Sequence, residues 1–149
     1  MSRHWSDVIV RLGACPEAVE WARTQPSAAV AWRTCQRSAW LTWVVDVTAG
    51  APGTGTVADR KRALLAAALA RTALQFVPAG EGRPLRAIEM RERWARREEG
   101  VTWDDVTRAA WAAGAAWAAE AAEAAWATQA GIVRQHYPRP PRMPRRVRA

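Results

Sequence analysis

The sequence is poor in the residues from which most catalytic and metal sites are built. It has two histidines, His4 and His136, and two cysteines, Cys15 and Cys35, and none of them has the spacing of a zinc finger or ribbon. No set of serine or cysteine with histidine and an acid has a spacing that suggests a nucleophilic site. We therefore predict no catalytic residue, no metal and no cofactor, and a protein that is not an enzyme.

Long apolar runs are absent as well. No stretch reaches the roughly 18 uncharged residues that a membrane span needs, and a charge follows soon after the N-terminus, unlike in a secretory signal. We expect a cytoplasmic protein with no membrane contact, in which Cys15 and Cys35 are thiols of the small, core-packed kind. A redox pair would require these two cysteines to pack together.

The positive charge is concentrated at one end. All but one of the 22 basic residues are arginine, and the net charge is +8. A group of arginines lies within the last eleven residues of the chain, among prolines that favour an extended polyproline conformation: Arg139, Arg142, Arg145, Arg146 and Arg148. The sequence therefore predicts a helical domain over residues 1–137 and a basic Pro/Arg-rich tail over 138–149. Such a tail could contact nucleic-acid phosphates, bind an acidic protein surface or an SH3-type groove, or stay solvated.

Helix start signals recur along the domain. Pro16, Pro26 with Ser27, Thr56 and Pro84 predict helices over 16–23, 26–35, 57–77 and 84–99. A further segment, 40–46, is apolar, and its β-branched residues leave a strand open as an alternative. We predict an all-α fold, a compact bundle of about five or six helices.

The last and longest predicted helix begins at Thr102 and continues to about Ala130. It is rich in alanine and tryptophan, and at about 100° per residue its apolar positions gather on one side, so we expect a core spine with Trp117 buried. Ten tryptophans are present in all, and most of them should fill the core. Trp111 and Trp126 lie toward the edge of the apolar stripe and are the best candidates for exposed partner-binding anchors.

The segment 50–56 has the glycine spacing of a phosphate-binding loop. Gly50 and Gly55 are correctly placed, but Thr56 stands where the loop needs lysine and Val57 where it needs serine or threonine. Without the lysine and the metal-binding hydroxyl, we expect an ordinary loop between two helices.

A pattern of cysteine and tryptophan over 15–43 resembles the Imm-5-like immunity proteins, small helical proteins of bacterial toxin–immunity loci and phage genomes. The pattern consists of Cys15, Trp21, Ala31-Trp32 with Cys35, and Trp40 with Trp43, and it continues in 85–89, in the alanine/tryptophan helix and in 132–138. The resemblance covers most of the chain. It implies a helical 40–46 segment and a protein that neutralises another protein.

Two departures from the family shape the functional hypothesis. Ala39 stands where relatives carry an acid before the first tryptophan of that helix, and the chain is strongly basic. Immunity proteins that mask basic nuclease clefts are acidic, so we expect an acidic or neutral partner here. The sequence thus predicts an immunity-like or anti-defence binding protein, and the alternative is a phage or bacterial nucleic-acid-associated or virion-assembly protein that uses the tail.

Overall fold

The computed structural model describes residues 4–114 and 126–144. In these two ranges the chain forms eight α-helices and no strand, which confirms the all-α prediction and exceeds the five or six helices expected. A 3-10 turn, η1 (Leu74–Phe76), follows the fifth helix. The α-helices are, in chain order, α1 (Asp7–Arg11), α2 (Pro16–Arg23), α3 (Ala28–Thr34), α4 (Ser38–Ala49), α5 (Val57–Ala73), α6 (Arg83–Ala95), α7 (Trp103–Ala113) and α9 (Trp126–His136).

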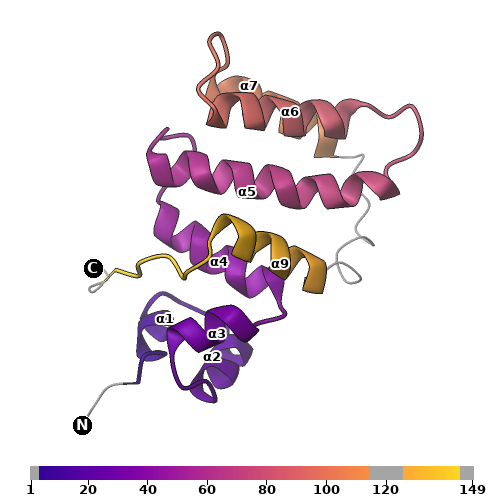
Figure 1. Cartoon of the computed structure of the whole chain (residues 1–149). Coiled ribbons are helices and arrows are strands. Elements are labelled where there is room, and N and C mark those ends of the chain that lie inside the picture. The colour runs from indigo at the N-terminus through magenta and orange to yellow at the C-terminus, as the bar shows by residue number, and fades with distance from the viewer. Residues whose placement is uncertain (1–3, 115–125, 145–149) are drawn as a thin grey trace.

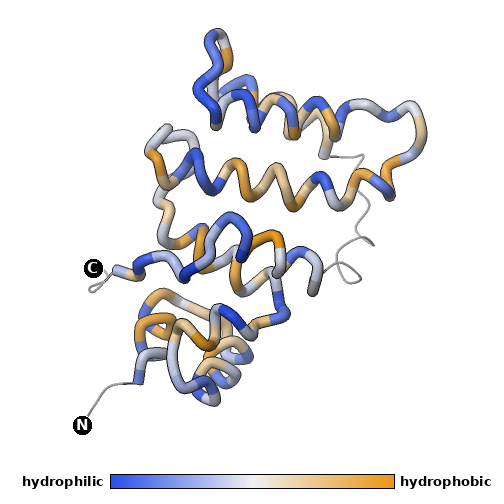
Figure 2. The backbone as a smooth tube through the Cα atoms, in the orientation of Figure 1, coloured by the Kyte–Doolittle hydropathy of each residue, from blue (hydrophilic) through white to orange (hydrophobic). Residues whose placement is uncertain are grey.

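The helices are arranged in layers, as Figure 1 shows. Helix α5 lies between the α6–α7 pair on one side and the α4–α9 pair on the other, and it contacts α4, α6 and α9. The short helices α1, α2 and α3 form a group beyond α4, at the far end from α6 and α7. Helix α6 and the tail are mainly hydrophilic, whereas apolar positions recur along α5 and in the N-terminal group (Figure 2).

Three helices begin at side-chain caps, and α3 begins at Ala28 instead of the predicted residue 26, whereas α2 and α6 begin at or next to the predicted prolines without a side-chain cap. Ser27 Oγ accepts a hydrogen bond from Val30 N at 3.2 Å, and Thr56 Oγ1 accepts one from Asp59 N at 3.1 Å. Thr102 forms a full capping box with Asp105. Each cap satisfies a backbone N–H that the helix itself leaves unpaired, so these short polar residues fix where the helices begin. The short α1 precedes the first predicted start and lacks such a signal.

Two helix ends differ from the predicted ones. Helix α6 ends at Ala95 instead of residue 99, because Arg97 takes a left-handed conformation with φ 62°. Helix α5 ends at Ala73, and η1 occupies part of the remaining predicted length. The segment 40–46 lies within α4, which removes the strand alternative.

The predicted long C-terminal helix corresponds to two helices in the described residues. It begins at Thr102 as expected, but α7 packs on α6 whereas α9 packs on α4 and α5. The two helices lie in different layers on either side of α5 (Figure 1), so they are not two parts of one straight helix. The 115–125 segment, with Trp117, lies outside the described residues. Alanine-rich sequence favours helix at every position, so its periodicity does not reveal where the chain changes direction.

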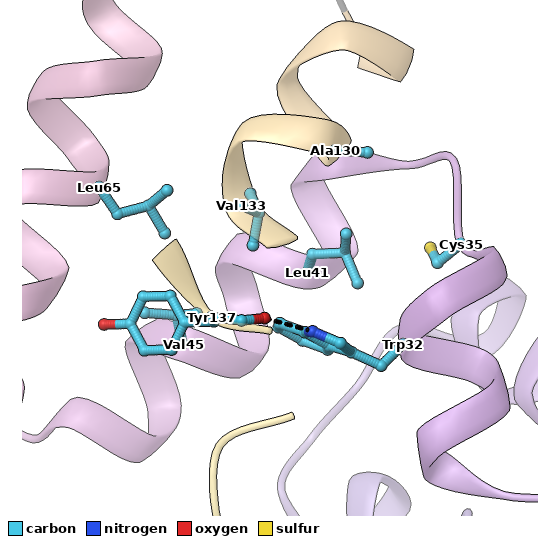
Figure 3. Packing of buried hydrophobic residues seen from close by; sticks show 8 residues of the cluster. All are labelled: Trp32, Cys35, Leu41, Val45, Leu65, Ala130, Val133 and Tyr137. Carbon is cyan, nitrogen blue, oxygen red and sulfur yellow. Dashed lines mark hydrogen bonds between the residues drawn. The ribbon is translucent and has the colours of Figure 1, made fainter. Parts of the chain in front are cut away.

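The main core joins four helices that are distant in the sequence. Its buried residues, shown in Figure 3, are Trp32, Cys35, Leu41, Val45, Leu65, Ala130, Val133 and Tyr137. The Trp32 indole Nε1 donates a hydrogen bond of 2.8 Å to the Tyr137 carbonyl, which fixes the end of α9 against α3. Burial raises the pKa of the Tyr137 hydroxyl to about 12. Cys35 belongs to this core, as expected, whereas Cys15 is exposed, and both are free thiols.

Candidate functional site

Trp111 is exposed, as predicted for a partner-binding anchor. Its residue surface is 86% accessible, and it is the one tryptophan of the described side chains in the exposed class. Trp32 and Trp94 are buried, and the remaining described tryptophans are partly buried, so the prediction that most indoles pack inside is confirmed for these residues. Trp126 begins α9, but its side chain lies outside the described part of the chain.

Charged side chains accompany Trp111 on the outer face of α7. Asp104 and Arg108 are also exposed, and their spacing of seven and three residues from Trp111 places all three on one side of the helix. Arg108 pairs at 3.4 Å with Asp105 and leaves most of its side chain in solvent. Tryptophan and arginine are the residue types most enriched among the strongest contributors to protein–protein binding. The α7 face therefore has the composition of a small contact surface.

The tail does not project freely from the domain over its described part. It runs from α9 alongside α4 and the N-terminal helices (Figure 1), and Pro140 and Met143 line an apolar pocket there. We call this the tryptophan pocket; its walls include five tryptophans, Trp5, Trp21, Trp32, Trp40 and Trp43. Arg139 and Arg142 are exposed, whereas Pro140 and Met143 are half-buried. Arg145, Arg146 and Arg148 lie outside the described residues.

A three-residue spacing explains how the tail can be docked and basic at once. A polyproline helix repeats every three residues, so Pro140 and Met143 share one face while Arg139 and Arg142 share another. The sequence contains this signal as a Pro-Arg-X repeat beginning at Pro138, which composition alone does not reveal. The tail is thus an amphipathic strip with an apolar face on the domain and an arginine face in solvent.

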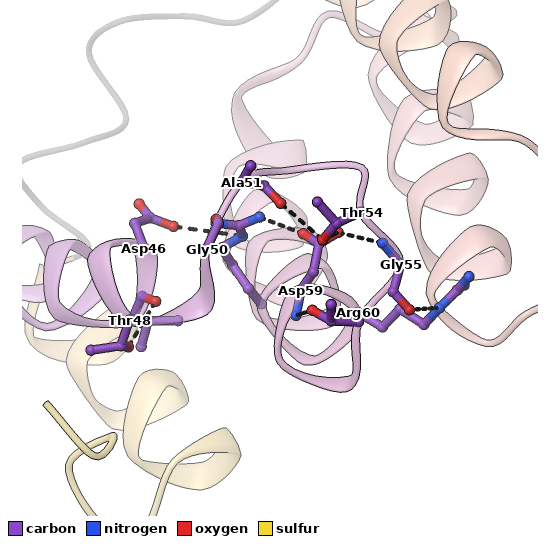
Figure 4. Close-up of polar contacts among 11 residues, drawn as sticks. Asp46, Thr48, Gly50, Ala51, Thr54, Gly55, Asp59 and Arg60 are labelled. Carbon is purple, nitrogen blue, oxygen red and sulfur yellow. Dashed lines mark hydrogen bonds and ion pairs between the residues drawn. The ribbon is translucent and has the colours of Figure 1, made fainter. Parts of the chain in front are cut away.

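The loop over 50–56 is a closed polar cluster. It connects α4 to α5, with a helix on each side as predicted. At its centre lies Asp59, which is 1% exposed and accepts hydrogen bonds from Gly55 N at 3.0 Å, from Thr54 Oγ1 at 3.3 Å and from the Arg62 guanidinium (Figure 4). Arg62 also donates to the Gly50 carbonyl at 2.7 Å.

Within this cluster, hydrogen-bond donors of the loop are bonded to the Asp59 carboxylate. Burial alone would raise the pKa of Asp59, but the hydrogen bonds from Gly55 and Arg62 and the Arg62 charge hold that pKa below its ordinary value. The Gly55 N–H, a backbone donor of the loop, is bonded to the Asp59 carboxylate at 3.0 Å. The arrangement supports the prediction that the loop is structural and does not bind nucleotide phosphates.

Metal-ligating and membrane-spanning features are missing from the residues that the structure describes. These residues contain no cluster of three or more His, Cys, Asp or Glu side chains placed to hold a metal ion. None of the described helices combines the length and the apolar composition that crossing a bilayer requires.

No family model, no curated protein and no solved structure matches this chain. The resemblance to the Imm-5-like immunity proteins therefore stays a prediction from the sequence motifs.

Proposed function

We propose that this chain is a small helical binding protein, an immunity-like or anti-defence factor that acts by neutralising a protein partner. The observation that carries the proposal is the 86% exposure of Trp111 on α7, in a chain whose other described tryptophans pack inside. An indole exposed to water does not gain the free energy of apolar burial, and a partner that covered it would provide that free energy. The cysteine and tryptophan pattern that resembles the Imm-5-like immunity proteins also supports a protein-binding function.

Charge suggests what the partner's surface is like. The chain carries +8 overall, although on the α7 face itself the exposed Arg108 is accompanied by Asp104 and is paired with Asp105. A basic surface attracts an acidic partner and repels a basic one, which affects association rates most strongly at low salt. We therefore expect a partner with an acidic or neutral contact surface.

The test is capture of the partner followed by titration of the purified pair. The tagged chain is used to recover proteins from a lysate of the native host or of cells expressing neighbouring genes, and the recovered partner is then titrated by calorimetry. We expect Trp111→Ala to weaken binding about tenfold or more, as loss of a central indole anchor does.

Val57→Ala is the matched control, because Val57 is 76% exposed on a different helix, α5. It should leave the affinity unchanged. Recovery of no protein partner at micromolar concentration, or equal affinities for the wild type and Trp111→Ala, would contradict the proposal.

One observation favours the alternative function, contact with nucleic acid through the tail. Arg139 and Arg142 are exposed on a docked strip, which holds their charges outward from the domain. Each phosphate contact contributes about 0.9 to the slope of log affinity against log salt on duplex DNA. Replacing both arginines with glutamine keeps Pro140 and Met143 in place, and it should lower the slope by about 1.8 if these arginines contact phosphates. An unchanged slope would exclude them as the contact.

A further inference from the structure

A large cavity opens where α4, α5, α6 and the start of α7 meet, and it belongs to neither the α7 face nor the tail. Its volume is about 650 Å³, within the range of small-molecule sites. Asp46 contributes from the end of α4, Arg62 and Ala66 from α5, Arg91 from α6, and Trp103 from α7. We call it the Arg91 cavity.

Arg91 differs from the other partly buried arginines of the described residues. Arg60, Arg62 and Arg134 each donate hydrogen bonds to a carbonyl or a carboxylate. Arg91 is also half-buried, yet it has no hydrogen bond or ion pair with any side chain or backbone group in the described ranges. Its guanidinium nitrogens are not sealed from solvent, because among the described residues no buried side-chain nitrogen or oxygen lacks a hydrogen-bond partner. Arg91 is therefore accessible from the cavity and free to accept a ligand there.

The cavity is lined by two acids, Asp46 and Asp59, and two arginines, Arg62 and Arg91, and the described contacts among them do not include Arg91. Asp59 is already engaged by Arg62 and the loop. Asp46 lies at the cavity rim with an exposed carboxylate, 4.0 Å from the Arg62 guanidinium. Desolvation and the nearby Arg62 charge lower the pKa of Arg91, and Asp46 opposes this only in part. Asp46 would also repel a second negative charge, so the electrostatics favour a ligand with a single one.

The aromatic wall of the cavity is held rigidly. Trp103 packs at 4.6 Å between ring centroids against Trp94. On another side it meets Gly53, where φ is +83° and a Cβ would overlap the indole. Small side chains, Ala63 and Ala66 of α5, also line the cavity, and Trp103 packs against the core cluster that contains Ala63. A flat or apolar body could therefore contact a fixed indole without moving the protein.

We propose that the Arg91 cavity binds a small organic carboxylate, with the Arg91 guanidinium on the carboxylate and Trp103 against an aromatic or apolar body. A guanidinium presents paired N–H donors that match the two oxygens of a carboxylate. The ligand supplies an acceptor for Arg91, which has none among the residues 4–114 and 126–144. This site goes beyond the proposed partner binding, since it lies apart from Trp111 and takes a different chemistry.

Benzoate is the probe, and benzamide, which has the same shape without the charge, is its control. We expect benzoate at about 10 mM to raise the melting temperature, because a ligand that binds only the folded state stabilises it. Benzamide should produce no shift, and phenyl phosphate, a dianion at pH 7.5, should produce a smaller one. No shift with benzoate, or equal shifts with benzoate and benzamide, would overturn the proposal.

Arg91→Met and Ala66→Leu separate binding from a structural role. Arg91→Met removes the guanidinium at similar volume, so we expect benzoate binding weakened about tenfold or more. A lowered melting temperature together with unchanged benzoate affinity would show that Arg91 serves only the fold. Ala66→Leu fills the cavity without changing its charge and should also remove the benzoate shift.

Arg86→Met is the matched control, an exposed arginine on the same helix with no ion pair in the described residues. It should leave the benzoate shift as in the wild type. Should Arg91→Met fail to fold, Arg91→Lys keeps the charge without the paired donors and should still weaken benzoate binding. Retention of the full benzoate shift in both Arg91→Lys and Ala66→Leu would place the benzoate elsewhere and overturn the assignment.

Discussion

The two ends of the molecule are packed with different kinds of side chain and enclose different free volumes. At the N-terminal end, five indoles and the docked tail leave about 60 Å³ of free space in the tryptophan pocket. At the other end, small alanine side chains and charged groups surround about 650 Å³ in the Arg91 cavity. Large rigid side chains exclude water and add stability, whereas small ones leave space that only polar groups or a ligand can use. The first end therefore contributes mainly stability, and the second contains the cavity for which we propose a ligand.

The largest expected effect is at the aromatic end. Trp32 is 3% exposed and hydrogen-bonded to the Tyr137 carbonyl, so Trp32→Ala should cost about 3–5 kcal/mol of the free energy of unfolding, as large aromatic truncations in a core do. Urea denaturation followed by circular dichroism measures this loss. Trp111→Ala is the control and should change stability by less than about 0.5 kcal/mol. Equal losses of unfolding free energy in the two variants would contradict the placement of Trp32 in the core and Trp111 at the surface.

The next largest loss of stability is expected at Asp59, at the charged end of the molecule. Asp59→Ala removes one partner of a buried pair: Gly55 N loses its acceptor, and Arg62 keeps only the Gly50 carbonyl and the more distant Asp46, which should cost about 3 kcal/mol. Asp105→Ala, an exposed acid in a helix cap, should cost only about 1 kcal/mol by the same urea measurement.

The pKa of Asp59 adds a pH dependence with a defined sign. Because the folded pKa lies below the ordinary 3.8, the carboxylate's contribution is complete above that value and is lost as pH falls through the folded pKa. Asp59→Asn should therefore flatten the acid limb of a plot of stability against pH. An acid limb identical to that of the wild type would contradict the described hydrogen bonds.

A smaller effect is expected from the tail. Met143 is half-buried against the tryptophan pocket, so Met143→Ala should cost about 1–2 kcal/mol, less than a fully buried methionine. The tryptophan fluorescence of this variant should shift to the red as the pocket admits water. Arg142→Ala, on the solvent face of the same strip, should change neither reading. A tail that can be removed after Tyr137 without loss of stability would show that it does not close this end.

The last prediction concerns chemical labelling of the two cysteines, whose reactivity reports how accessible the N-terminal end is to solvent. Cys15 is exposed and should react quickly with iodoacetamide at pH 8, whereas Cys35 is buried in the core and burial raises the pKa of its thiol. Mass spectrometry should find one rapid alkylation in the native protein and two after denaturation. Rapid labelling of both thiols would show that the N-terminal end opens readily.

Local chemistry is sufficient for several of the helix starts and for the prediction that the 50–56 loop is an ordinary connection between two helices. Thr56 and Thr102 cap their helices through bonds to residues three positions ahead, so the signal lies within a few residues of sequence. The presence of Thr56 in place of a lysine likewise argues against a phosphate-binding loop on local grounds alone. Helical periodicity is enough to place Trp111 at the surface, since an edge position is a property of one helix.

Other features depend on contacts between distant residues. Within 102–130 the local sign of the end of α7 is Gly114, its C-cap, but that glycine lies in alanine-rich sequence and does not show that α9 packs in a different layer. The docking of Met143 requires tryptophans about a hundred or more positions earlier, whereas arginine composition alone suggests a solvated tail. Arg91 resembles an ordinary surface charge on α6 until α4, α5 and α7 surround it. The sequence determined which segments are helical, because caps and propensities act locally. The tertiary structure alone decided which side chains lose their water, because burial depends on what packs against them.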